Sequence, residues 1–172
     1  MRLTAHYDFP ASPQRLAELL ATPSFVDAAA RAAGAESTQV SVSGQPTGEF
    51  TVTVRATLPA AQLPARAQML AAGGLELRQA SVWQPPKADG SREASAAAEI
   101  AGAPVHCEGR IVLSPNRDGS QLDYSADVKA SIPLLGRSIE EAAVPAMLKV
   151  LTTQHQTALA WLSEGTAAGA EA

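Results

Sequence analysis

At 172 residues the chain is long enough for one domain with a substantial hydrophobic core. Its net charge of −4 and its lack of a Lys/Arg cluster argue against nucleic-acid binding. The single cysteine, Cys107, excludes an internal disulfide. No apolar run is as long as a signal peptide or a membrane-spanning helix, so we expect a cytoplasmic protein without an integral membrane segment.

The chain is predicted to open with one strand and two short helices. In residues 2–9, apolar and polar residues alternate, as in a strand with one buried face. Ser12-Pro13 and Thr22-Pro23 each combine a capping hydroxyl with a proline at the first helical position. Gly34 has the position of a residue that ends the second helix.

Six further strands are predicted in series. Alternation of apolar and polar residues places them at residues 40–43, 50–57, 75–83, 92–100, 105–113 and 122–131. Turn signals such as Asp89-Gly90 lie between them. Consecutive hairpins imply an antiparallel sheet with one apolar face. Residues 59–74 interrupt the series, and Pro64 predicts a short extra helix there.

Residues 138–163 predict one long helix that covers the apolar face of the sheet. Ser138 and Glu141 have the spacing of a capping box. Steps of 100° per residue give its apolar face six members: Ala143, Met147, Val150, Gln154, Ala158 and Trp161. Gln154 is the polar exception and needs a partner on the sheet, a water or a ligand. We expect a single domain over residues 1–163 and a disordered tail over 164–172.

The element order predicts an α+β fold, and it resembles the helix-grip fold of the START-like (SRPBCC) superfamily. That superfamily includes the birch-pollen-allergen family and polyketide cyclases. Three passages carry the resemblance: FPASP at 9–13, YSADVKASIPLLG at 124–136 and HQTALAWL at 155–162. The passage DVKASIPLLGRSIE, at 127–140, is more narrowly similar to an actinobacterial branch known as a domain of unknown function. The resemblance implies a curved antiparallel sheet of about seven strands, wrapped around the long C-terminal helix.

The resemblance also implies a cavity between sheet and helix that holds an apolar small molecule. Small residues on the predicted inner face, such as Ala94, Ala96 and Ala98, leave room there, unless the sheet simply lies closer to the helix. A small-molecule site needs mostly apolar walls with a few polar groups. We therefore predict these ligand-binding residues: Tyr7, Gln79, Ser81, Trp83, Tyr124, Met147, Gln154 and Trp161.

No pattern in the sequence indicates a catalytic residue, a cofactor or a metal. The histidines are far apart and lack the spacing of a zinc site, and His6 and His106 fall on the predicted outer face. Cys107 is expected to behave as a small buried apolar residue. Glu140, near the buried edge of the long helix, is the one carboxylate retained as a candidate.

Three functions therefore stay open. The first is a binding or carrier protein for a lipid-like or polyketide-like ligand, with no chemistry of its own. The second is a protein-interaction module that uses the outer sheet face or a groove. The third is a cyclase- or hydrolase-like enzyme, as the superfamily contains, which requires a titratable group in the cavity.

Overall fold

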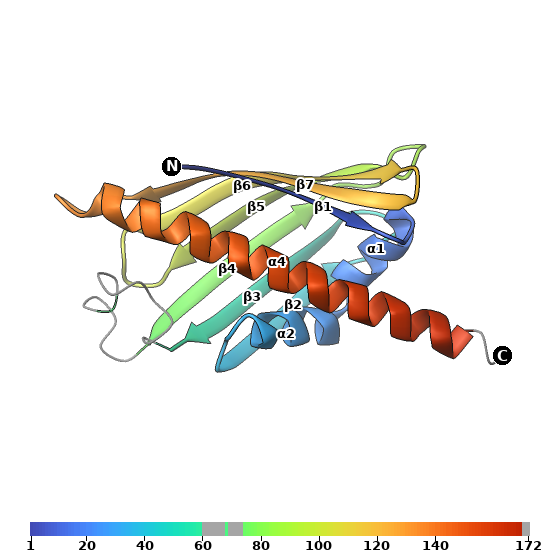
Figure 1. Ribbon diagram of the computed structural model, residues 1–172, viewed down its shortest axis with the longest axis horizontal. Coiled ribbons are helices and arrows are strands. Elements are labelled where there is room, and N and C mark those ends of the chain that lie inside the picture. The colour runs from blue at the N-terminus through green and yellow to red at the C-terminus, as the bar shows by residue number, and fades with distance from the viewer. Residues whose placement is uncertain (60–67, 69–73, 170–172) are drawn as a thin grey trace.

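The computed structural model describes residues 1–59, 68 and 74–169, and its element order is the predicted one (Figure 1). One strand and two helices come first: β1 (Arg2–Phe9), α1 (Pro13–Leu20) and α2 (Pro23–Ala32). Six strands follow: β2 (Ser37–Gly44), β3 (Phe50–Leu58), β4 (Leu75–Trp83), β5 (Arg92–Ile100), β6 (Val105–Asn116) and β7 (Gly119–Ala130). The long helix α4 (Gly136–Gly169) is last. The extra helix predicted within residues 59–74 lies outside the described residues.

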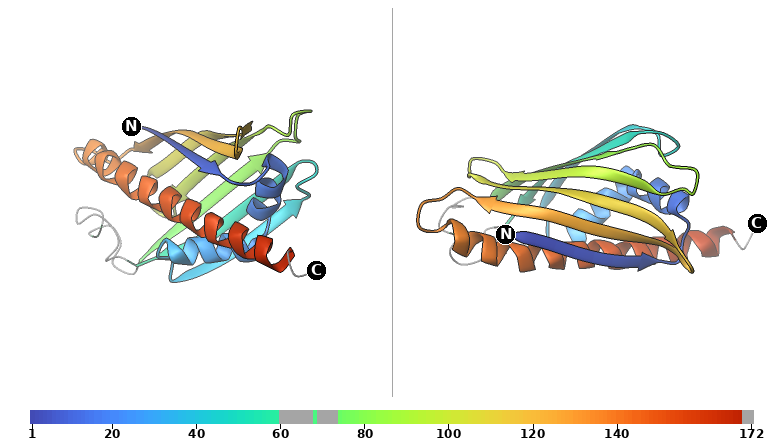
Figure 2. Two further views of the ribbon diagram at one scale, coloured as in Figure 1. Left: turned by 45° about the vertical axis from the view of Figure 1, so that its right-hand side comes forward. Right: turned by 90° about the horizontal axis from the view of Figure 1, so that it is seen from above.

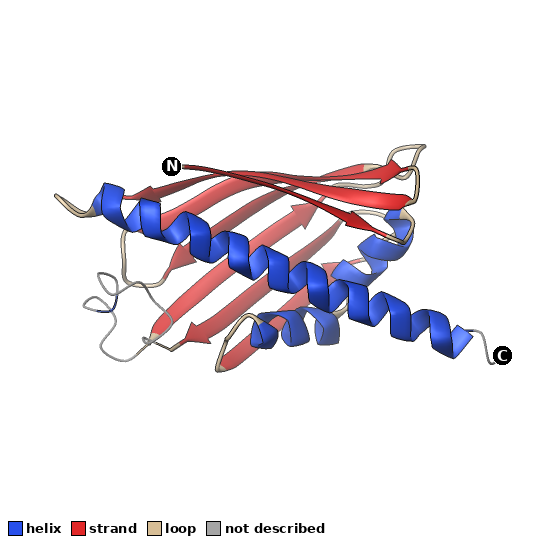
Figure 3. Ribbon diagram, in the orientation of Figure 1, coloured by secondary structure: helices blue, strands red, loops and turns tan. Residues whose placement is uncertain are grey.

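The seven strands form one antiparallel sheet in the order β1-β7-β6-β5-β4-β3-β2. The first strand therefore lies at one edge and the second at the other, and α1 and α2 carry the chain between them (Figure 3). Ser12 caps α1 as predicted, since its side chain accepts a hydrogen bond from the Arg15 amide. The α+β class and the helix-grip order are confirmed.

The antiparallel register aligns inward side chains in rows across the sheet. One row runs through Ala5, Tyr124, Ile111, Ala94, Trp83 and Phe50. The next runs through Leu3, Ala126, Gly109, Ala96, Ser81 and Val52. These rows face α4, which forms a second layer across the sheet (Figure 2). No helix in the described ranges has the length and apolarity that crossing a membrane requires.

The buried face of α4 is the predicted one, with a single exception among the residues named for it. Ala158 is 2% exposed as expected, but Val150 is 45% exposed although we predicted it to be buried. Thr152 is exposed on the predicted solvent side, and its hydroxyl also meets that of Tyr7 of β1. Val150 is exposed because α4 packs mainly against α2 and against the edge strands β1 and β7 rather than against the middle strands.

Both predicted ends of α4 are also corrected. The helix begins at Gly136, so Ser138 is a helical residue rather than the cap, and Glu141 pairs with Arg137 at 3.1 Å. The helix continues to Gly169, through most of the segment predicted to be a disordered tail. Glu164, Ala167 and Ala168 favour this extension, whereas Gly165 and Thr166 are weak helix formers, so the added turns are the least stable part of the helix.

Gly109 allows β6 and β7 to lie close together, because it has no side chain. A Cβ atom added there would lie 2.6 Å from the Ser125 carbonyl oxygen and 2.5 Å from the Ala126 Cβ. We expect Gly109→Ala to lower the free energy of unfolding by about 1–3 kcal/mol, because the two strands must move apart. Gly48→Ala, where no atom lies within 4 Å of the added Cβ, is the matched control and should be near neutral. Urea unfolding of both variants measures the difference, and equal stabilities would contradict this account.

Candidate functional site

The candidate site is the inner face of the sheet where it meets α4, and one end of it is closed by packing. Phe50 stacks on Trp83 with ring centroids 5.7 Å apart and planes at 8°. Phe25 of α2 meets Trp161 of α4 edge to face at 5.7 Å. Two of the predicted ligand-binding residues, Trp83 and Trp161, are thus placed where α1, α2 and the second half of α4 cover the sheet.

The other end of the inner face reaches solvent. Inward-facing apolar residues of the middle strands are only half-buried there: Leu77, Ala96, Ala98 and Ile100. Gln79, in the same row as Ala98, is exposed although it faces inward. On α4, the predicted site residue Met147 is half-buried and Val150 is exposed. We call this region the open half of the inner face.

Tyr7 connects the sheet to the helix beside the open half. Its hydroxyl lies 2.9 Å from Thr152 Oγ1, which itself donates to the Leu148 carbonyl oxygen at 3.0 Å. The Tyr7 ring also lies against His155, with centroids 4.9 Å apart, and His155 Nε2 donates to the Asp8 carbonyl oxygen at 2.9 Å. These contacts fix α4 against β1, so Tyr7 has a structural partner of its own.

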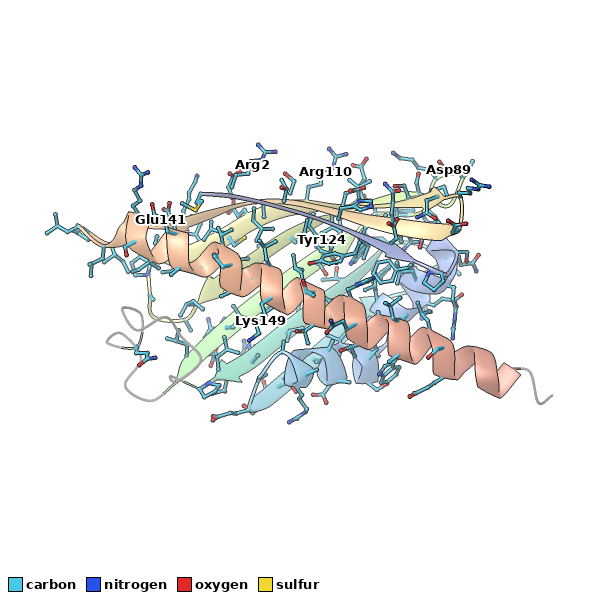
Figure 4. All side chains as sticks on the ribbon, in the orientation of Figure 1. Arg2, Asp89, Arg110, Tyr124, Glu141 and Lys149 are labelled. Atoms are coloured by element: carbon cyan, nitrogen blue, oxygen red, sulfur yellow. The ribbon has the colours of Figure 1, made fainter. Side chains whose placement is uncertain are left out.

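The Tyr124 hydroxyl, unlike that of Tyr7, remains available to a ligand. It lies between the strands and α4 (Figure 4), edge to face with Tyr7 at 6.1 Å. Its hydroxyl makes no hydrogen bond within the described part of the chain. Burial raises the pKa of the Tyr124 hydroxyl, and the nearby Tyr7 raises it further, so the group stays protonated at neutral pH and can donate a hydrogen bond.

Two more predicted site residues also have unused polar groups. Gln154 of α4 is half-buried, and no residue in the described ranges hydrogen-bonds to its amide. Ser81 of β4 is 7% exposed, and its hydroxyl likewise has no partner among the described residues. None of these groups is a fully enclosed polar atom, so water or a ligand can reach them.

The structure adds a buried charge that we did not predict. Arg92 of β5 is 2% exposed on the inner face, donates from Nη2 to the Pro46 carbonyl oxygen at 2.6 Å and lies over the Phe50 ring. Its Nε and Nη1 have no partner among the described residues, and burial lowers the pKa of the guanidinium. The alternating pattern of β5 could have predicted that Arg92 faces inward, because Arg92 lies on the same face of the strand as Ala94. The arginine joins the start of β5 to the β2–β3 turn at the closed end.

The retained carboxylate has a structural role. Glu140 accepts hydrogen bonds from the Ala130 amide at 3.0 Å and from the Met1 amino group at 3.2 Å. The Ala130 amide in the first place, and the amino group in addition, hold the pKa of Glu140 below its ordinary value. The buried Cys107 has a raised pKa because of desolvation, as expected for an unreactive thiol.

A hollow of about 510 Å³ lies on the outer face of the sheet instead. It is lined by three consecutive residues from each of five strands: 39–41, 53–55, 78–80, 97–99 and 106–108. The middle residue of each triplet points inward, so the outward side chains of the two flanking rows form the walls. Ion pairs of Arg78 with Glu76 and Glu99 occupy this surface, which is typical of a solvated sheet face.

A family model described as "Protein of unknown function (DUF2505)" matches residues 4–162. No curated protein matches the sequence. Among solved structures, TTHA0849 from Thermus thermophilus is 14% identical over 93% of this chain and 98% of that one, with a TM-score of 0.58. Ms6760 from Mycobacterium smegmatis is 13% identical over 95% and 92%, with a TM-score of 0.56.

The similarity extends to a structure titled Ara h 8.0201, which is 10% identical over 93% of this chain and 98% of that one, with a TM-score of 0.52. At these identities the likeness shows the fold alone. It agrees with the helix-grip architecture expected from the sequence.

The outer face carries a testable electrostatic cluster. His6 is exposed as predicted; its Nδ1 lies 2.7 Å from Asp123 Oδ1 and its Nε2 lies 3.4 Å from Asp8 Oδ1. The hydrogen bond to Asp123 is the main cause that raises the His6 pKa above 6.5. The same bond holds the Asp123 pKa below its ordinary value.

We expect an NMR pH titration to give His6 a pKa above 6.5, and Asp123→Asn to bring it down. Asp127→Asn, four residues further along the outer side of β7, should leave the His6 pKa unchanged. The pair stabilises the fold below the unfolded pKa of histidine, and this contribution is lost as the pH rises through the folded pKa of His6. It is also lost in acid, when Asp123 is protonated. An unchanged His6 pKa in Asp123→Asn would contradict the assignment.

Proposed function

The chain belongs to the DUF2505 family, and we propose that it is a binding or carrier protein for an apolar small molecule, lipid-like or polyketide-like. The ligand lies against the open half of the inner face, between the middle strands and the first half of α4. The observation that carries the proposal is the partial exposure of inward apolar residues such as Ile100 and Leu77. Apolar surface in contact with water costs free energy that a bound apolar molecule recovers.

The available polar groups indicate the chemistry of the ligand. The Tyr124 hydroxyl is a donor for a ligand carbonyl or hydroxyl oxygen, and the Gln154 amide can both donate and accept. Small side chains at Ala96 and Ala98 leave the space beside them to the ligand. These features favour a mainly apolar molecule with one or two oxygen functions, such as a lipid or a polyketide.

Binding without chemistry accounts best for these groups. A cyclase or hydrolase needs a titratable group that exchanges a proton near neutral pH. The raised pKa of Tyr124 makes its hydroxyl a poor base there. Glu140 is engaged by backbone and amino-group donors at the end of β7.

Adjacent alanines of β5 provide a matched test of the site. Ala98 faces inward and is half-buried, whereas Ala97 faces outward and is exposed. We expect Ala98→Phe to fill the open half and to weaken binding of a fluorescent fatty acid such as cis-parinaric acid at least tenfold. Ala97→Phe adds the same side chain outside the site and should leave the dissociation constant unchanged. Fluorescence titration of both variants measures the constants.

Other outcomes of this titration argue against the proposal. If the wild-type protein takes up neither the fatty acid nor an environment-sensitive dye, the ligand site is absent. If Ala97→Phe weakens binding as much as Ala98→Phe, the probe binds elsewhere. Tyr124→Phe removes only the hydroxyl and should weaken binding of an oxygenated ligand about two- to tenfold, as the loss of one hydrogen bond does.

A further inference from the structure

The loop between β7 and α4 carries two exposed leucines, which we call the leucine tip (Leu134 and Leu135). Leu134 is 105% exposed and Leu135 is 41% exposed. Figure 1 shows this loop at the end of the molecule opposite α1. The β5–β6 turn lies at the same end, since the Ser131 amide donates to the Pro104 carbonyl oxygen at 2.8 Å. The tip is therefore next to the open half of the inner face.

The backbone holds Leu134 outward in an unfavourable conformation. The Leu135 amide donates to the Ile132 carbonyl oxygen at 3.2 Å, which closes a tight turn with Pro133 second and Leu134 third. Leu134 has a φ of 63°, the sign that the third position of a type II turn requires and that glycine or asparagine normally supplies. Leu134 is the one non-glycine residue with positive φ in the described part of the chain. A strained and fully exposed leucine indicates a role outside the folded domain.

The base of the tip is fixed. Gly136 donates to the Ile132 carbonyl oxygen at 2.8 Å and lies so close to the Ala130 carbonyl oxygen that a side chain would not fit. Glu140 accepts a hydrogen bond from the Ala130 amide across the same loop. The leucines are thus presented on an anchored turn, and binding through them requires little further ordering.

We propose that the leucine tip docks the protein on the surface of a lipid bilayer. Two leucines on a convex turn offer far less area than the roughly 800 Å² per partner that a stable protein interface needs. A bilayer needs no matching pocket, because side chains enter the boundary between headgroups and acyl chains. Transfer of one leucine contributes about ten- to hundredfold to the partition coefficient, so the two give weak and reversible docking.

Charge has a minor part in this docking. The net charge of the chain is −4, and of the two exposed cations nearest to the tip in the sequence, Lys129 and Arg137, the second is paired with Glu141. Docking is therefore driven by the apolar side chains and occurs on neutral bilayers. The inference rests on Leu134 and Leu135 and is independent of the ligand site, although docking at the open end suits the exchange of an apolar ligand with a membrane.

Sedimentation of the full chain with phosphatidylcholine vesicles tests the proposal. We expect measurable partitioning that persists in about 1 M NaCl, because apolar insertion is not screened by salt. Leu134→Gly should lower the partition coefficient at least tenfold. The same variant should unfold at an equal or higher temperature, since glycine accepts positive φ without strain. Ala160→Ser, which makes an exposed position in the second half of α4 more polar and lies outside the open half, should leave partitioning unchanged.

Three results would overturn the proposal. The first is no partitioning of the wild-type chain at any lipid concentration. The second is equal partitioning of the wild-type chain and Leu134→Gly. The third is a dimer in analytical ultracentrifugation that Leu134→Gly converts to monomer, because the tip then contacts a second copy of the chain rather than lipid.

Discussion

The arrangement of the whole molecule depends on how the edge strand β1 holds α4. The Tyr7 hydroxyl meets Thr152, and the His155 ring donates to the Asp8 carbonyl oxygen while its face lies against Tyr7. These contacts place the helix over the β1–β7 edge and decide which of its faces is buried. A helix centred over the middle strands would bury Val150. In this arrangement Val150 is exposed, and the inner surface of β4 and β5 stays open.

One end of the inner face is closed by packed side chains, and the other end reaches solvent. At the closed end, aromatic rings from β3, β4, α2 and α4 interlock, and Arg92 joins β5 to the β2–β3 turn beneath them. At the other end the inward positions of β5 are Ala96, Ala98 and Ile100, and the two alanines are too short to reach across to the helix. The closed end is therefore tightly packed, while apolar inward residues at the other end remain partly accessible to solvent.

Period-two alternation was sufficient to predict the sheet. β4 and β5 have the predicted bounds, because Trp83 and Ile100 end clear alternating runs beside turn signals. The exposure of Val150 was not predictable from the sequence of α4, because it depends on where Tyr7 and Asp8 of β1 hold the helix. Arg92 was missed for a different reason. Its face was readable from Ala94, but a strand-initial arginine is normally solvated, and the β2–β3 turn that buries it is not apparent in the local sequence.

The candidate site, like the fold, could be predicted from the sequence only in part. The alternating pattern correctly placed Tyr124 and Ala98 on the inner face, because every second residue of a strand faces the same side of the sheet. It did not reveal that the Tyr7 hydroxyl is occupied by Thr152 while the Tyr124 hydroxyl has no hydrogen-bond partner among the described residues. That distinction depends on the exact position of the helix, and so do the open half and any ligand that it accepts.

The pairing of β1 with β7 joins residues 2–9 to residues 120–127. During synthesis β1 therefore has no neighbour until more than 110 further residues have been made, and α4, which it holds, is made after β7. The pairing of β1 with β7 is slow to form, because the chain between them must lose conformational entropy before the strands make their contacts. Until then β7 is an unprotected sheet edge, the position at which strands of different chains associate.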